Sequence, residues 1–142
     1  MQLNEDAIRA IVTEVVKTIV NNEPVREVDP SGVITIRTDT VRCEPFMQEG
    51  VRLKDVVSLE EAPRMGAGIM ELDHTSFPWT LTYDEYDLVL DGVLEIEIGG
   101  RVHTGHPGDI IYIPKGSSIR FQTPSTARYA YFVTPANWQE NA

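Results

Sequence analysis

The hydrophobic positions follow two different periods, one before and one after residue 32. Between residues 3 and 24, LNEDAIRAIVTEVVKTIVNNEP, the apolar residues recur at the three- and four-residue spacing of one helical face: Ile8, Ile11, Val12, Val15, Val16, Ile19 and Val20. Asn4 suits the N-cap, and Pro24 ends the pattern. The pattern predicts an N-terminal amphipathic helix over residues 1–20, and its many β-branched residues indicate that it needs a surface to pack on.

After the helix, the pattern changes to that of short strands. Residues 21–32, NNEPVREVDPSG, combine two prolines, a glycine and mixed charge, which predicts a linker. Apolar runs at 32–38, 65–72, 79–104, 108–123 and 127–135 then follow, with turn pairs at Asp91-Gly92 and Gly99-Gly100. Many short strands without helical periodicity indicate an all-β sandwich or barrel over residues 33–142.

Composition excludes two classes of partner. The chain has 12 basic and 22 acidic residues, so its formal net charge is -10, which opposes a phosphate backbone or an anionic lipid surface. No apolar run approaches the roughly 20 residues of a membrane-spanning helix. We therefore expect no nucleic acid and no membrane partner. The single cysteine, Cys43, forms no intrachain disulfide, and the absence of a secretory signal pattern favours a reducing cytosol.

Two spacings resemble the signature motifs of the cupin superfamily, whose members are small double-stranded β-helix barrels. Glu85 is followed by six residues and then Gly92, and in GDIIYIPKGSSI the fixed positions are Gly108, Pro114 and Gly116. In that superfamily the first motif carries two histidines and a glutamate, the second carries one histidine, and the four side chains hold a divalent metal. The resemblance implies a cupin barrel of the jelly-roll type.

Three of the four metal ligands are missing here. The positions that match the histidines are Trp79 and Leu81 (or Pro78 and Thr80) and Ile119, which leaves only Glu85. One carboxylate cannot hold a transition metal, and the histidines of the chain, His74, His103 and His106, lie outside the motifs. We therefore expect no tightly bound transition metal. A metal-dependent cupin enzyme stays open as an alternative that elemental analysis would reveal.

The two-residue period of a strand identifies the side chains that face the same way as Glu85. Trp79, Tyr83 and Asp87 share its parity, as does Leu81, and the motif glutamate of cupins points into the barrel. We expect these residues on one wall of a cavity, with Ile119 and Phe121 on the opposite wall. An inward carboxylate is costly without a partner, which Tyr83 or Lys115 would supply. The alternatives are that Trp79 and Tyr83 are core aromatics and that Lys115 is a solvated lysine.

A longer resemblance covers about residues 33–138. The strings SFPWTLTYDE, IPKGSSI and PANW are similar to those of the ethanolamine-utilization protein Q (EutQ-like) family, which also lacks the cupin histidines. The resemblance implies a homodimer of the bacterial cytoplasm, associated with the ethanolamine-utilization microcompartment. It also implies acetate kinase activity, in which acetyl phosphate and ADP give acetate and ATP. Functional positions of the family match Phe77, Trp79, Tyr83 and Glu85.

The sequence leaves the kinase mechanism and its alternative open. It has no G-x-x-x-x-G-K-[ST] phosphate loop. The simplest mechanism has Mg²⁺ held by the phosphates of ATP or ADP and by Glu85 or Asp87, Lys115 or Arg64 on a phosphate, and an aromatic ring on adenine or acetate. The alternative is a non-catalytic assembly or shell-association factor. The predicted helix resembles the segments that attach cargo to microcompartment shells, although it could instead pack on its own barrel or on a dimer partner.

Overall fold

The computed structural model describes residues 4–6, 8–9 and 23–139 and divides the chain into two compact units, Met1–Arg42 and Cys43–Ala142. In the first unit, strand β1 (Arg26–Val28) pairs antiparallel with β2 (Ile34–Ile36), and the 3-10 helix η1 (Thr38–Thr40) follows. The predicted linker, residues 21–32, therefore contains β1 and its turn. The predicted helix 1–20 lies mainly outside the described residues and stays a prediction.

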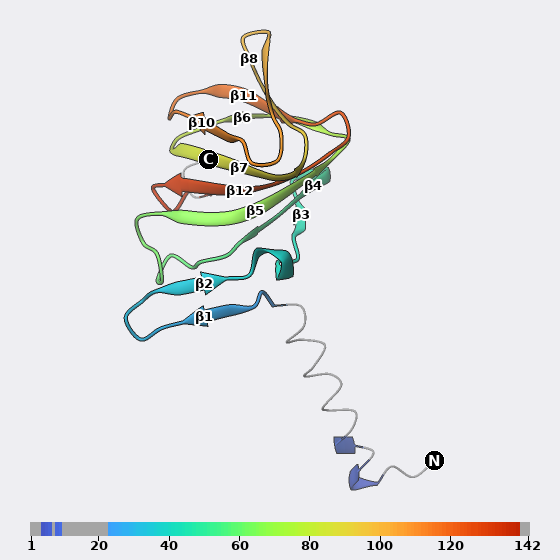
Figure 1. Cartoon of the computed structure of the whole chain (residues 1–142), viewed down its shortest axis with the longest axis vertical. Coiled ribbons are helices and arrows are strands. Elements are labelled where there is room, and N and C mark those ends of the chain that lie inside the picture. The colour runs from blue at the N-terminus through green and yellow to red at the C-terminus, as the bar shows by residue number, and fades with distance from the viewer. Residues whose placement is uncertain (1–3, 7, 10–22, 140–142) are drawn as a thin grey trace. The chain divides into compact units, whose positions relative to one another are not determined.

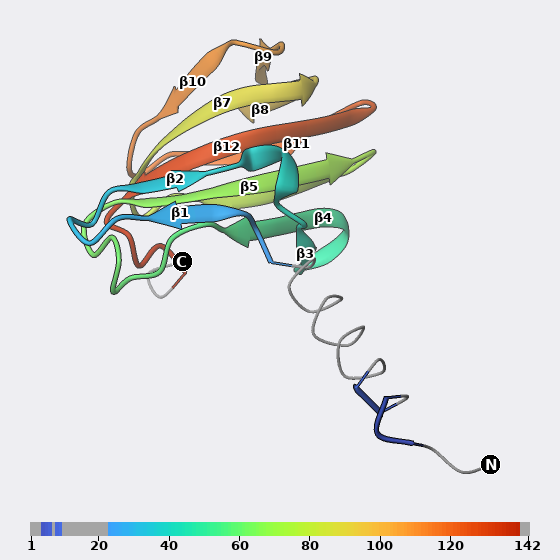
Figure 2. The same cartoon turned by 60° about the horizontal axis from the view of Figure 1, so that its bottom comes forward.

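The second unit consists of two antiparallel sheets (Figures 1 and 2). The six-stranded sheet has the order β10-β7-β12-β5-β4-β3, and the four-stranded sheet has the order β6-β11-β8-β9. The strands are β3 (Glu44–Phe46), β4 (Gln48–Asp55), β5 (Gly66–Asp73), β6 (Ser76–Thr80), β7 (Asp84–Gly92), β8 (Leu94–Ile98), β9 (Arg101–Gly105), β10 (Ile110–Ile113), β11 (Ser118–Gln122) and β12 (Thr126–Thr134). The all-β prediction is confirmed. No helix in the described part of the chain is long and apolar enough to cross a membrane.

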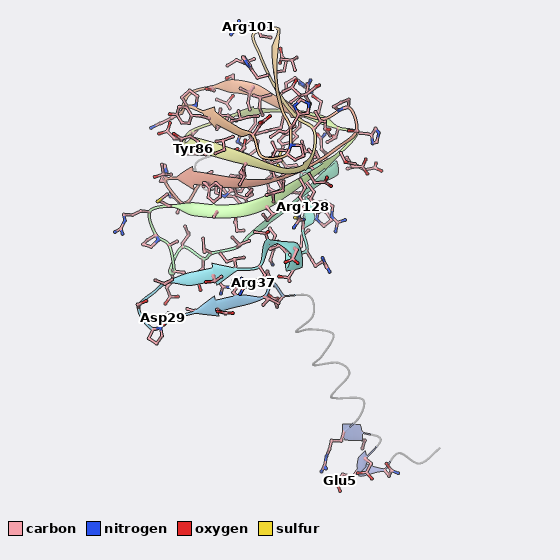
Figure 3. The ribbon with its side chains drawn as sticks, in the orientation of Figure 1. Glu5, Asp29, Arg37, Tyr86, Arg101 and Arg128 are labelled. Atoms are coloured by element: carbon pink, nitrogen blue, oxygen red, sulfur yellow. The ribbon has the colours of Figure 1, made fainter. Side chains whose placement is uncertain are left out.

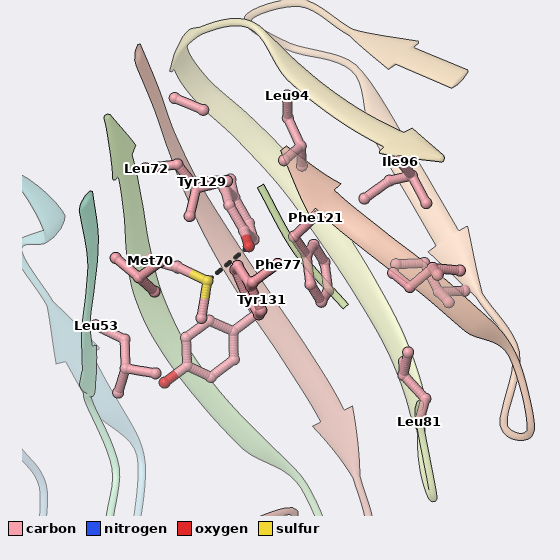
Figure 4. Packing of buried hydrophobic residues seen from close by; sticks show 14 of the residues in the cluster. Leu53, Met70, Leu72, Phe77, Leu81, Leu94, Ile96, Phe121, Tyr129 and Tyr131 are labelled. Atoms are coloured by element: carbon pink, nitrogen blue, oxygen red, sulfur yellow. Dashed lines mark hydrogen bonds between the residues drawn. The ribbon is translucent and has the colours of Figure 1, made fainter. Parts of the chain in front are cut away.

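The core of this unit lies between the sheets because each strand sends alternate side chains inward. On β12 the buried residues include Tyr129, Tyr131 and Val133, and Phe121 on β11 packs against Tyr129 with ring centroids 6.1 Å apart. Figure 4 shows this packing and the hydrogen bond from the Tyr129 hydroxyl to the Met70 sulfur, 2.7 Å long. The core is therefore rich in large aromatic side chains that carry a polar end.

The two predicted turn pairs have different roles in the structure. Gly99-Gly100 closes the β8–β9 hairpin, in which Ile98 pairs with Arg101, as expected. Asp91-Gly92 is not a hairpin turn, because β7 and β8 belong to different sheets and Gly92 still pairs with Ala127 of β12. Gly92 has φ +75°, and a Cβ there would lie 2.0 Å from the Thr126 carbonyl oxygen. The glycine is required by this close backbone approach as well as by its φ.

Replacing Gly92 by alanine should therefore destabilise the fold strongly. Gly100 has a similar φ of +79° but nothing within 4 Å of an added Cβ, so Gly100→Ala is the matched control. We expect Gly100→Ala to cost about 1 to 2 kcal/mol of unfolding free energy, from backbone strain alone. Gly92→Ala should cost about 3 kcal/mol or more. Urea denaturation measures both, and equal losses would show that the contact with Thr126 is relieved at little cost.

Candidate functional site

A small cavity lies between the two sheets, and most of its lining is aromatic. Its volume is about 10 Å³, which is room for about one water molecule. Phe46 and Trp79 are half-buried, whereas the rest of the lining is buried, so these two rings mark the side nearest solvent. The lining residues are Phe46, Met70, Phe77, Trp79, Tyr83, Glu85, Phe121, Tyr129, Tyr131 and Trp138.

Two carboxyl side chains are buried on the inward face of β7: Glu85 lines the cavity, and Asp87 lies beside Glu85 but is not among the lining residues. Glu85 is 5% exposed and Asp87 is 0% exposed, whereas Tyr86 between them, labelled in Figure 3, points outward and is 53% exposed. Burial raises the pKa of Glu85 to about 7, although the neighbouring Asp87 carboxyl lowers it somewhat. Burial raises the pKa of Asp87 well above its usual range, and the charge of Glu85 raises it further. The pair therefore holds protons near neutral pH.

Asp87 is the exceptional member of the pair. Neither of its carboxyl oxygens meets the geometry of a hydrogen bond with a described group, although the neighbouring Glu85 carboxyl is close enough to share a proton with it. A buried carboxyl without a donor costs several kcal/mol, and protonation reduces that cost only in part. Apart from a proton shared with Glu85, Asp87 therefore has no donor among the described residues.

A hydrogen-bonded pair of aromatic residues lines the cavity together with Glu85. The Trp79 indole Nε1–H donates to the Tyr83 hydroxyl over 2.7 Å, which fixes both rings. Burial, and then the charge of Glu85, raises the pKa of Tyr83, so its hydroxyl keeps its proton. The Tyr83 hydroxyl is thus a fixed neutral group beside the acids.

The segment after β12 contributes a further ring to the cavity. Trp138 packs edge to face with the rings of Phe46, Trp79, Tyr83 and Tyr131, with centroids 5.8 to 6.1 Å apart. Asp55 at the end of β4 holds this segment: it accepts from the Trp138 indole (3.4 Å), from the Gln139 amide (3.1 Å) and from the Tyr131 hydroxyl. One carboxylate thus fixes the position of the ring that closes the cavity.

The structure brings most of the predicted site residues together. Phe77, Trp79, Tyr83 and Glu85 line the cavity, and Asp87 lies beside Glu85. Lys115 does not reach it: its side chain is exposed on the loop between β10 and β11, and its backbone N–H donates to Asp84 over 2.8 Å. The suggestion that Lys115 pairs with the inward carboxyl is therefore wrong.

The predicted division into walls also needs correction. Trp79 lies on β6 in the four-stranded sheet, whereas Glu85 and Asp87 lie on β7 in the six-stranded sheet, and the chain crosses between sheets at residues 81–83. Ile119 pairs directly with Trp79, so it is that residue's neighbour and not its opposite, and it does not line the cavity. The predicted alternation, with every second side chain pointing inward, continues through the segment between the sheets, since Leu81 and Tyr83 are both buried.

Sequence reasoning missed half of the lining. Phe46, Met70, Tyr129, Tyr131 and Trp138 come from segments that carry no cupin motif. The alternation in ARYAYFV was a signal for the inward tyrosines, but it does not say that β12 runs beside β7. The contribution of Trp138 depends on the path of the segment after β12, which no local pattern indicates.

The cavity does not fit a metal-bound nucleotide. No group of three or more His, Cys, Asp and Glu side chains that could hold a metal occurs among the described residues. Mg²⁺ keeps near-octahedral coordination with several waters, and about 10 Å³ does not hold such a shell. None of the described lining residues is basic, so phosphate has no cationic partner there. The earlier expectation that Glu85 or Asp87 holds Mg²⁺ together with a nucleotide finds no support in this geometry.

Two facing antiparallel sheets that enclose such a cavity define the class of protein as a cupin-type barrel. A solved structure of a cupin domain from an Enterobacter cloacae transcriptional regulator matches with a TM-score of 0.54 at 14% identity, covering 61% of this chain and 97% of that one. This likeness concerns the fold alone.

Within that class the chain belongs to the EutQ family, described as ethanolamine utilisation protein EutQ, whose model matches residues 1–140. A Clostridioides difficile relative named acetate kinase EutQ is 40% identical over 96% of this chain and 92% of its own length. A Salmonella typhimurium relative of the same name is 47% identical over 81% of this chain but only 48% of its own length, so this chain spans about half of it. The solved Clostridium difficile EutQ structure has a TM-score of 0.81 at 42% identity and covers 84% of this chain and 93% of that one. The resemblance inferred from SFPWTLTYDE, IPKGSSI and PANW is confirmed.

The buried Glu85 should make stability fall as pH rises. Its pKa is about 7 in the fold against an ordinary value of 4.5, so the folded state binds the extra proton between these values. The stabilisation is complete below pH 4.5 and is lost as pH rises through 7, a change on the order of 3 kcal/mol. Urea denaturation from pH 5 to 8 measures this slope.

The same titration in Glu85→Gln should show a shallower slope across this range, because the contribution of Glu85 is lost while that of the buried Asp87 remains. Glu60→Gln, which removes an exposed glutamate, is the matched control and should keep the wild-type slope. A Glu85→Gln slope equal to that of the wild type would contradict the raised pKa.

Proposed function

We propose that this chain has acetate kinase activity in ethanolamine utilisation, transferring a phosphoryl group from acetyl phosphate to ADP. The observation that carries the proposal is the 40% identity to the relative named acetate kinase EutQ, which extends over 92% of that relative's length. The family description, ethanolamine utilisation protein, supports the same setting. Of the groups in acetyl phosphate and ADP, the two-carbon acetyl group is the smallest, so it comes nearest to the size of the cavity.

In this proposal the cavity takes the acetyl end of acetyl phosphate. Glu85, protonated near neutral pH, donates a hydrogen bond to the carboxylate oxygen on which negative charge develops as its bond to phosphorus breaks. The methyl group packs on the rings of Phe77 and Trp79, and Tyr83 supports Trp79 through their hydrogen bond. An acetyl group is larger than one water, so binding must displace the Trp138 ring that Asp55 holds.

ADP must then bind outside the cavity. A pocket of about 370 Å³ at the ends of β4, β5, β7 and β12 includes Arg52 and Arg128, the type of side chain that binds phosphate, together with the acids Glu71, Asp73 and Asp91. Arg128 bonds Glu71 over 2.8 Å, and Arg52 donates to the Cys43 carbonyl over 2.8 Å, so both guanidiniums are held in place. Lys115 is a further exposed cation on the same unit. Mg²⁺ would arrive with the nucleotide phosphates.

The kinase proposal is tested by ATP formation from acetyl phosphate and ADP with the purified chain. Glu85→Ala should lower kcat/KM at least tenfold, because it removes the hydrogen bond to the leaving acetate. The amide in Glu85→Gln still donates a hydrogen bond but does not titrate, so this variant should keep more activity than Glu85→Ala and should lose the fall in rate above pH 7. Glu60→Gln should stay within about twofold of the wild type. The wild-type rate should fall above pH 7 as Glu85 loses its proton. Equal rates for Glu85→Ala and the wild type would overturn this assignment of the site.

A second candidate is a non-catalytic factor that organises microcompartment shell or cargo, as a homodimer. The small volume of the cavity and its lack of described basic lining residues favour it, since both are unfavourable for phosphoryl transfer. The predicted helix over residues 1–20 would supply the attachment. In this case, deleting residues 1–20 should abolish co-sedimentation with shell protein, whereas Glu85→Gln should not change it. Retained co-sedimentation after the deletion would contradict a role for the helix.

A further inference from the structure

We propose that the barrel cavity recognises a small organic ammonium ion, of the primary alkylamine class, through the Glu85–Asp87 carboxyl pair and the aromatic rings around it. This inference goes beyond phosphoryl transfer and does not rest on it. It rests on three features of the site: the buried carboxyls without a basic residue in the described lining, the aromatic rings around the cavity, and the size of the cavity.

The charge of the site is the first argument. Glu85 and Asp87 are both buried, and no lysine, arginine or histidine is among the described residues that line the cavity. A buried carboxylate is stabilised by an opposite charge, which the described part of the protein does not place there. An ammonium ion supplies that charge and also three N–H donors. Glu85 would bind the ammonium ion directly, and Asp87, which does not line the cavity, would act on it through its charge beside Glu85.

The rings form the second argument. Trp138 meets Trp79 at an interplanar angle of 66° and Tyr83 at 61°, with centroids 6.1 and 6.0 Å apart, and Phe46 meets Trp79 at 61°. These rings pack edge to face against one another and also line the cavity, so an occupant of the cavity would lie among them. Aromatic faces are electron-rich, and cages of this kind bind alkylammonium groups. An anion meets the same faces unfavourably.

Size is the third argument. A cavity of about 10 Å³ fits a single water-sized group, and the –NH₃⁺ head of an amine is of that size. The carbon chain would leave toward Phe46 and Trp79, the two half-buried rings. This favours an unbranched primary amine over a quaternary one, whose head is much larger. Nucleotides and acetyl phosphate exceed the cavity.

The amine and acyl proposals require opposite protonation states of the same pair. An ammonium ion binds the ionised carboxyls, so its binding strengthens as pH rises through the pKa of Glu85, near 7, and releases protons. Acetyl binding uses the protonated form and weakens over the same range. Each proposal can therefore fail without the other.

The test is a titration of the full chain with methylammonium and ethanolamine, followed by tryptophan fluorescence and calorimetry at pH 6 and pH 8. The chain has two tryptophans, and both line the cavity, so fluorescence reports on the site. Ethylene glycol is the neutral control and acetate the anionic one. We expect saturable amine binding that is at least fivefold tighter at pH 8, with proton release detected as a dependence of the binding heat on buffer ionisation.

Variants identify the site. Glu85→Gln and Asp87→Asn should each weaken amine binding at least tenfold, whereas Glu60→Gln should leave it unchanged. Proton release by the wild-type chain is the readout that survives if a variant fails to fold. No saturable binding of either amine would overturn the proposal, and so would binding without proton release, unchanged binding in a folded Glu85→Gln variant, or equal binding of ethylene glycol. Amine binding without ATP formation would support this inference and contradict the kinase.

Discussion

The structure depends on how the barrel accommodates two adjacent acids on the inward face of β7. Glu85 and Asp87 are buried by the same alternation that buries Val89, so the strand cannot place its apolar residues in the core without placing the acids there as well. Their desolvation raises both pKa values, and their proximity means that two negative charges are costly. The protons, or a ligand that replaces them, are therefore part of the stability of the fold.

The aromatic residues around the pair follow from this constraint. Surroundings of low dielectric constant keep the carboxyls protonated, and the rings of Trp79, Tyr83 and Trp138 provide such surroundings. The polar atoms of the two tryptophans form hydrogen bonds with other residues. The indole of Trp79 bonds Tyr83, and that of Trp138 bonds Asp55. Neither indole N–H donates to Glu85 or Asp87, so the two tryptophans supply no hydrogen bond to the buried carboxyls. A cupin barrel of the EutQ family thus has carboxyl and aromatic chemistry where the cupin pattern has histidines.

Local sequence patterns predicted the chemistry of the site better than its shape. Parity was sufficient to place Trp79, Tyr83, Glu85 and Asp87 inward, because side-chain alternation is a local property. It did not show that the chain changes sheets between Thr80 and Asp84, which makes Ile119 the neighbour of Trp79. It also missed Trp138, whose position depends on Asp55, 83 residues earlier. Pairing between distant segments decides these features, and no short window of sequence contains it.

The account rests on the claim that the Glu85–Asp87 pair holds a proton at neutral pH. The most direct measurement is a carboxyl-carbon NMR titration of the wild-type chain, assigned with Glu85→Gln and Asp87→Asn. Glu85 should titrate near pH 7, and Asp87 should keep its proton well above the ordinary range of an aspartate. Titration of both groups near pH 4, as for solvated carboxylates, would contradict the claim.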